Sequence, residues 1–272
     1  MTTITIHTNS RTTTSRPATR TRSDDVKALP AAIRSEWIKL ASLRANKAIV
    51  GLTAVVTAGV AGALARSTDH HTLSASVLFI YPLPLVAALA LVTGILMFTS
   101  EAQHGTLATT LAARPTRWVI AAAKTVMATA VGLAMGVTAM VAGFGGAVLG
   151  GAQVGHGAPV SRALWALLYI TLATVIGLGV GMIVRHSAGA ISGLLMWSFV
   201  VEGLLAPVLP KALVHFVPFS AGYRLLDAGS DFKPPVMIAH VLPRPAYALI
   251  FGGYALASVV IGTALLYRRD TS

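Results

Sequence analysis

The sequence predicts an all-α polytopic membrane protein with six transmembrane helices, an N-terminal interfacial helix and a re-entrant or interfacial hairpin before the last span. Of its 272 residues, 55% are hydrophobic and only 11% are charged, whereas about 25% are charged in a typical soluble domain. Six uninterrupted apolar stretches are also long enough to cross about 30 Å of hydrocarbon as helices. A large soluble core would instead be divided into short strands and amphipathic helices.

The apolar stretches define the spans of a six-helix transmembrane domain at positions 48–267. The fourth and fifth are separated only by Arg185, His186 and Ser187. Two spans are favoured over one long helix, because one helix would carry a charge near its centre. The predicted spans are 48–65, 77–98, 125–150, 163–184, 188–209 and 246–267.

Two different segments precede the first span. Positions 1–25 are rich in Thr, Ser and Arg and have no apolar stretch, which predicts a disordered cytoplasmic tail. An organellar transit peptide, which has a similar composition, is the alternative. Positions 26–47 predict an interfacial amphipathic helix or, alternatively, an extension of the first span. Its apolar stripe comprises Leu29, Ile33, Trp37, Leu40 and Leu43, and its candidate functional residues are Glu36, Trp37, Lys39 and Leu40.

The placement of basic residues predicts the orientation in the membrane. With the N-terminus inside, 15 of the 21 Lys and Arg residues fall in cytoplasmic segments, as the positive-inside rule requires. Both termini, including positions 268–272, are therefore expected in the cytoplasm of a multi-pass protein of the cell membrane. Nine of these residues lie in positions 1–47, where they can meet anionic lipid. Lipid explains the net charge of +12 better than nucleic acid does, so no nucleic-acid partner is expected.

Several kinds of chemistry lack their sequence signatures. The chain contains no cysteine, which excludes disulfides, thiolate catalysis and cysteine-based metal sites. It also lacks a phosphate-binding P-loop and the H-E-x-x-H and G-x-S-x-G motifs of intramembrane proteases. We therefore expect no catalytic residue, metal site or cofactor in this chain, and any ATP must be used by another chain.

One acidic residue, Glu202, lies inside a predicted span. A carboxylate in hydrocarbon is costly unless it is paired, so Glu202 is a candidate functional residue. Its partner could be Arg224, His215 or a residue of a second protomer. Alternatively, Pro207 and Pro210 end the helix early and Glu202 reaches interfacial water.

Small residues spaced as G-x-x-x-G predict close helix packing within a bundle or a dimer. They occur at Gly132/Gly136, Gly146/Gly150, Gly177/Gly181 and Gly189/Gly193.

Two segments outside the spans are distinctive. The cytoplasmic loop at 99–124 contains a short predicted helix, 106–113, which starts after Gly105 and is stopped by Pro115. The outer segment at 210–245 is partly apolar and is interrupted by Pro218 and Gly222. It predicts a re-entrant or interfacial hairpin packed against protein, because unpaired backbone cannot face lipid.

Three motifs resemble the permease subunits of ABC-2 type transporters, in particular the single-domain permeases of actinobacteria. The first is Ser35-Glu36-Trp37-Ile38-Lys39-Leu40, before the first span. The second is the loop from Glu101 through Gly105-Thr106, Leu111-Ala112, Pro115 and Arg117 to Lys124. The third is Leu213 followed by Phe216-Val217-Pro218-Phe219-Ser220-Ala221-Gly222, before the last span.

The resemblance implies a half-transporter that forms a homodimer and binds two copies of an ABC ATP-binding subunit, which holds ATP and Mg. The N-terminal helix and the loop would contact that subunit, and the region of Glu202, Pro218 and Phe219 would form the pathway or gate. It further implies export of a hydrophobic or amphipathic substrate. A secondary transporter and an intramembrane enzyme are the alternatives. The implied coupling residues are Glu101, Gly105, Thr106, Leu107, Leu111, Arg114, Pro115 and Arg117.

Overall fold

The computed structural model describes residues 22–42, 44–67, 81–105, 116–152, 160–205, 208–226 and 242–269. Within these ranges the chain is α-helical and contains no β-strand. Six of the helices are long and apolar enough to cross a membrane. The predicted class, an all-α polytopic membrane protein, is therefore confirmed.

The first helix, α1 (Arg22–Ser42), precedes the spans. Four spans are the single helices α2 (Arg44–Ser67), α4 (Leu83–Gln103), α6 (Arg117–Leu149) and α7 (Val160–Val184). The fifth is continuous through α8 (Ser187–Met196), the π-helix η1 (Trp197–Val201) and α9 (Glu202–Leu205). The short helices α10 (Lys211–Val214) and α11 (Pro218–Arg224) follow, and α12 (Arg244–Arg269) is the sixth span.

Some boundaries differ from those predicted. The helix α1 begins at Arg22, inside the segment predicted as disordered, because the Ser-Asp-Asp sequence at 23–25 is typical of a helix start. The second span begins at Leu83 rather than at position 77, since proline is favoured at the start of a helix and Pro82 and Pro84 flank this one. The third span begins eight positions earlier than predicted, at Arg117.

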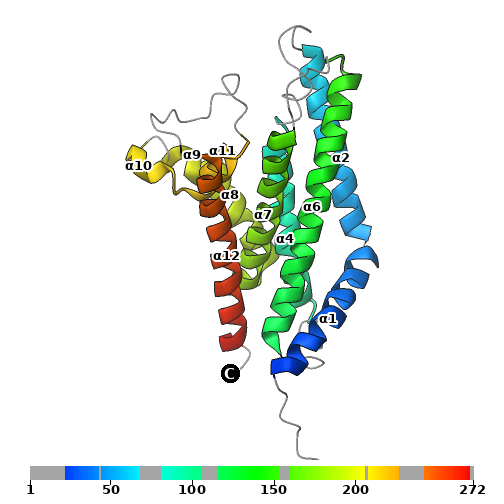
Figure 1. Cartoon of the computed structure of the whole chain (residues 1–272), viewed down its shortest axis with the longest axis vertical. Helices are drawn as coiled ribbons and strands as arrows, with labels where there is room; N and C mark the ends of the chain where they lie inside the picture. The colour runs from blue at the N-terminus through cyan, green and yellow to red at the C-terminus, as the bar shows by residue number, and fades with distance from the viewer. Residues whose placement is uncertain are drawn as a thin grey trace, which may run out of the picture.

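The helix α7 lies at the centre of the bundle. It packs against α4, α6 and α12, and α2 packs on another face of α6 (Figure 1). The core between these helices contains large buried side chains such as Phe98, Met135, Ile170 and Phe251. Figure 1 shows that α1 and the end of α12 lie at one end of the bundle, whereas α10 and α11 lie near the start of α12.

Three of the four predicted glycine pairs form close helix contacts within the chain. Gly132 and Gly136 face α7, Gly146 and Gly150 face α2, and Gly177 and Gly181 face α4. At Gly146 and Gly177, a Cβ atom would collide with the backbone of the facing helix. By contrast, no atom lies within 4 Å of a Cβ placed on Gly193.

The face of α1 that packs on the protein is rotated from the predicted stripe. Leu29 and Ile33 pack, with Ala32, against the start of α6. Trp37 was predicted on the same face, but it is 59% exposed, whereas Glu36 is only 7% exposed. The rotation has an electrostatic cause, because Glu36 meets a buried cation of α6.

Candidate functional site

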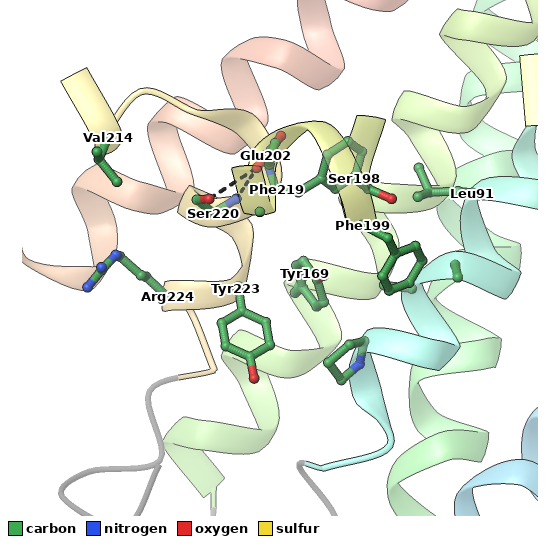
Figure 2. Close-up of a pocket in the computed structure, with 14 residues that line it drawn as sticks. Leu91, Tyr169, Ser198, Phe199, Glu202, Val214, Phe219, Ser220, Tyr223 and Arg224 are labelled. Carbon is green, nitrogen blue, oxygen red and sulfur yellow. Dashed lines mark hydrogen bonds between the residues drawn. The ribbon is translucent and has the colours of Figure 1, made fainter. Parts of the chain in front are cut away.

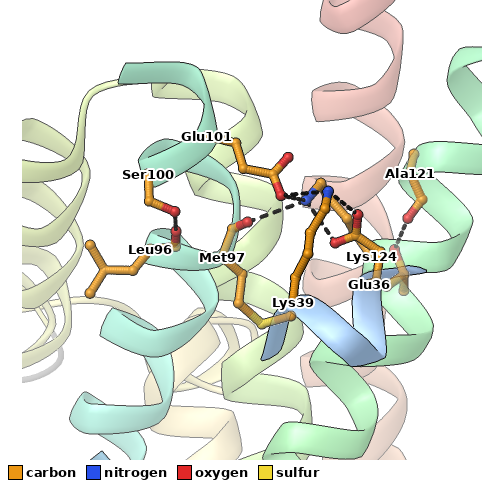
Figure 3. Close-up of polar contacts among 9 residues, drawn as sticks. Glu36, Lys39, Leu96, Met97, Ser100, Glu101, Ala121 and Lys124 are labelled. Carbon is orange, nitrogen blue, oxygen red and sulfur yellow. Dashed lines mark hydrogen bonds and ion pairs between the residues drawn. The ribbon is translucent and has the colours of Figure 1, made fainter. Parts of the chain in front are cut away.

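Four charged side chains from three helices meet at the end of the bundle that holds α1 (Figure 3). Lys124 of α6 lies 3.0 Å from Glu36 Oε2 of α1 and 2.9 Å from Glu101 Oε1 of α4. Lys39 of α1 lies 2.8 Å from Glu36 Oε1 and 3.2 Å from Glu101 Oε1. We call Glu36, Lys39, Glu101 and Lys124 the charge quartet. Two carboxylates and two ammonium groups make it neutral overall.

The quartet is buried on its Lys124 side and more open on its Lys39 side. The side chain of Lys124 is 1% exposed and that of Lys39 is 38% exposed. Burial acts to raise the pKa of Glu36, but Lys124 and Lys39 together outweigh it and hold this pKa below its ordinary value. Burial acts to lower the pKa of Lys39, but Glu36 and Glu101 outweigh it and raise this pKa. Glu36 and Lys39 are therefore charged at neutral pH.

The early start of α6 brings the quartet together. The sequence prediction placed Lys124 in the cytoplasmic loop, but it lies two turns inside α6. There its ammonium group faces Glu101 in the last turn of α4 and also donates to the carbonyl oxygen of Met97, at 3.4 Å. The prediction was wrong because a lysine near a membrane boundary is usually assigned to the loop. Its two carboxylate partners are distant in sequence.

Arg117, a predicted coupling residue, connects the start of α6 with the end of α12. Its guanidinium donates to the carbonyl oxygens of Leu266 (3.1 Å) and Tyr267 (2.6 Å) and lies over the Tyr267 ring. The backbone N–H of Trp118 donates to the Tyr267 hydroxyl at 3.1 Å. Carbonyls in the last turn of a helix lack intrahelical donors, and a cation there is favourable. Arg117 therefore caps α12.

Other predicted loop residues are only partly described. Gly105 follows α4 with a φ of +72°, a conformation that glycine adopts without strain. Gln103, at the end of α4, accepts a hydrogen bond from the Ser187 hydroxyl at the start of α8. The predicted helix 106–113 lies outside the described residues, as do Thr106, Leu107, Leu111, Arg114 and Pro115.

Toward the other end of α4, a cavity of about 350 Å³ lies between spans two, four and five and the outer helix α11 (Figure 2). Ala88, which lines it, is 13 residues before Glu101, or roughly 20 Å along the helix axis. Its walls are mostly apolar. The hydroxyl-bearing residues Tyr169, Ser198 and Tyr223 and the charged residues Glu202 and Arg224 also line it.

Glu202 is buried at 3% exposure beside this cavity, and its carboxylate accepts four hydrogen bonds. Two come from the backbone N–H groups of Phe219 (3.0 Å) and Ser220 (2.7 Å). The others come from the Ser220 hydroxyl (3.1 Å) and the indole N–H of Trp197 (3.0 Å). Glu202 therefore satisfies donors in the first turn of α11 and fastens this helix to the fifth span. None of these four donors belongs to the predicted partners Arg224 and His215.

The π-helix η1 explains the contact between Trp197 and Glu202. Residues five apart align in a π turn but not in an α-helix. Here the Glu202 N–H donates to the Trp197 carbonyl, and the Trp197 indole donates to the Glu202 side chain. π turns are frequent at functional sites.

The helix α11 is also held by aromatic and polar contacts. Pro218, a predicted gate residue, occupies its first turn, and Phe219 packs edge-on against Phe251 of α12 at 6.0 Å. His215 Nδ1 lies 2.9 Å from the hydroxyl of Tyr247, which is fully buried. These contacts pack the described part of 210–245 against α12 and the fifth span; the predicted hairpin and its place on the outer side of the membrane stay predictions.

No protein-family model and no curated protein matches this chain. Only the geometry of the chain itself therefore points to a function. This is a multi-pass membrane protein with a charge quartet at one end of α4 and a cavity toward the other.

Sequence analysis missed two residues, Tyr169 in the cavity lining and Trp197, which donates to Glu202. Trp197 is five positions from Glu202, a spacing that has no meaning in a regular α-helix. Tyr169 lies in the fourth predicted span, where a tyrosine near a membrane interface is ordinary. Neither position carries a signal in the sequence, because the π turn and the assembled cavity are needed to give each its role.

Proposed function

We propose that this chain is the membrane-spanning permease subunit of an ABC transporter, in which a separate subunit hydrolyses ATP. Under this proposal the quartet end faces the cytoplasm and docks the ATP-binding subunit. The chain contributes no ATPase chemistry and holds no cofactor, since ATP and Mg belong to the partner.

The charge quartet is the observation that carries the proposal. The segment 104–116 joins α4 to α6, and Glu101 and Lys124 lie on the two helices that it connects. The same two residues pair with Lys39 and Glu36 of α1. A force applied to this segment or to α1 is therefore passed to two spans, as rigid-body coupling requires. A loop that only connects two spans would not need the buried charge quartet beside it.

Further linkages extend this coupling to two more spans at the same end. Arg117 connects α6 to α12, and Gln103 connects α4 to α8. Polar contacts thus reach α8 and α12 in addition to the two spans that the docking segment joins. A partner that displaces 104–116 would tilt several helices together and so reshape the cavity toward the other end of α4.

The direction and the assembly also belong to the proposal. Export of a hydrophobic or amphipathic substrate fits a cavity whose walls are mostly apolar. The fifth span is the least covered of the six, because only 11% of its most apolar stretch is buried, and no atom lies within 4 Å of a Cβ placed on Gly193. We assign this face to a second copy of the chain, which gives a homodimer with two ATP-binding subunits. Both termini lie in the cytoplasm, as the positive-inside rule predicts.

The proposal is tested by co-expressing the tagged chain with any cassette ATPase encoded beside it. We expect the two to co-purify in detergent and the ATPase to be stimulated in reconstituted vesicles. Lys39→Gln should reduce stimulation, because it weakens the link between α1 and Glu101. Lys47→Gln replaces an exposed lysine of α2 outside the quartet and should have no effect.

A secondary transporter is the second candidate, and buried Glu202 is the observation that favours it, because proton-coupled carriers use carboxylates within spans. In this chain three of the four donors to Glu202 belong to α11, and they fasten that helix instead. Absence of any association with the ATPase, together with flux that depends on the proton gradient, would contradict the permease proposal and support this alternative.

A further inference from the structure

The cavity near Glu202 has the size and lining of a small-molecule site. Ligand pockets span roughly 300–1,000 Å³ and combine apolar walls with a few polar groups, and this cavity measures about 350 Å³. One wall is formed by Pro84, Ala87, Ala88 and Leu91 of α4, and Phe199 of η1 lies opposite Tyr223 in the view of Figure 2.

Tyr169 is the polar group that points to a ligand. It is 4% exposed and lines the cavity. Its ring packs against Phe251, with 5.5 Å between centroids, and its hydroxyl has no hydrogen bond to any residue that the structure describes. The hydroxyl oxygen is accessible from the cavity rather than enclosed by protein. A polar group of a molecule in the cavity would supply its hydrogen-bond partner.

The charged residues of the lining are already engaged. Both oxygens of Glu202 accept hydrogen bonds from protein donors. The Arg224 guanidinium lies over the Tyr247 ring, 5.9 Å from its centroid, and its side chain extends away from Tyr169 (Figure 2). Burial, with a smaller effect of Tyr81, raises the pKa of Tyr223 to about 12, so this group is neutral. The Arg224 cation of the described lining is therefore directed away from the Tyr169 hydroxyl.

We propose that this cavity binds an uncharged amphiphile, with its apolar body against α4 and Phe199 and one hydrogen-bonding group on the Tyr169 hydroxyl. This inference names the substrate class, and it rests on the proposed function because the bound molecule is a substrate only if the chain is a permease. Binding itself requires neither ATP nor a partner subunit. A failure of the site is therefore distinguishable from a failure of the permease proposal.

The test uses the purified full chain in lipid nanodiscs and four probes of similar size: naphthylmethanol, methylnaphthalene, naphthoate and naphthylmethylammonium. Saturable binding is measured by equilibrium dialysis against empty nanodiscs, which corrects for partition into lipid. We expect naphthylmethanol to bind more tightly than its charged analogues. Ala88→Trp, which fills the cavity, should abolish its binding, and size-exclusion chromatography and thermal unfolding check that this variant folds.

Tyr169→Phe isolates the hydroxyl and leaves the shape of the cavity unchanged. It should weaken naphthylmethanol about 3- to 10-fold, the effect of one neutral hydrogen bond, and leave methylnaphthalene unchanged. Tyr254→Phe is the matched control, because the Tyr254 hydroxyl donates to the Phe216 carbonyl and does not line the cavity. The inference is overturned by absence of saturable naphthylmethanol binding, by preference for either charged probe, or by equal binding to the Ala88→Trp or Tyr169→Phe variant.

Discussion

Replacing Lys124 with methionine tests whether the charge quartet fastens the helices. The Lys124 ammonium is 1% exposed and lies 3.0 and 2.9 Å from two carboxylates. Removing one partner of a buried ion pair costs about 3–5 kcal/mol, because the remaining charge is left uncompensated. Lys39→Met is the matched control. Its side chain is 38% exposed, and exposed pairs contribute only about 0.2–1 kcal/mol.

The free energy of unfolding of both variants can be measured by titrating dodecyl sulfate into mixed micelles. We expect Lys124→Met to lose at least about 2 kcal/mol more than Lys39→Met, the difference between the two ranges above. Adding Glu101→Gln to Lys124→Met should restore part of the loss, since it removes one uncompensated carboxylate. Equal losses in the two single variants would refute the reasoning, as would a further loss in the double variant.

Three further predictions use the same unfolding assay. The pKa of Glu36 is lowered from 4.5 in the folded chain, so below about pH 4.5 the unfolded chain binds more protons than the folded chain does. The free energy of unfolding should therefore fall as the pH drops through this range, and it should fall less in Glu36→Gln. Glu202→Ala should cost about 2 kcal/mol through loss of the cap on α11, whereas Glu202→Gln, which keeps an acceptor oxygen, should cost less; equal costs would contradict the capping role. Gly94→Ala should cost about 1–3 kcal/mol, because its Cβ would collide with the Thr174 carbonyl, whereas Gly253→Ala of α12 meets nothing within 4 Å and should gain up to about 1 kcal/mol from the helix propensity of alanine; the reverse order would contradict the packing described.

The spans were predictable because hydrocarbon imposes length and composition on any helix that crosses it. The ends of the spans were harder to predict. The prolines at 82 and 84 decide where the second span begins, although an apolar stretch continues before them. Lys124 was misassigned because its compensation comes from Glu36, 88 positions away, and from Glu101 on another helix. The spacing of residues in the sequence does not indicate either of these ion pairs.

The candidate site was predicted in its residues more than in its contacts. Glu36 and Lys39 were selected from one motif and Glu101 from another, and the structure brings them together. Glu202 was selected for the cost of burying a carboxylate, and its four hydrogen-bond donors were not predicted. Two of its four donors are backbone N–H groups of α11. Backbone donors are present at nearly every residue, so only the fold can show which of them meet a given side chain.

Cross-linking to the ATPase subunit tests the docking end most directly, because the chain contains no cysteine of its own. Leu107→Cys places a single thiol in the 104–116 segment, and Leu213→Cys places one on an exposed position of α10 near the other end. The account predicts that a short bifunctional thiol reagent links the ATPase to position 107 and not to position 213. Cross-linking at position 213 alone, or at neither position in a co-purified complex, would contradict it.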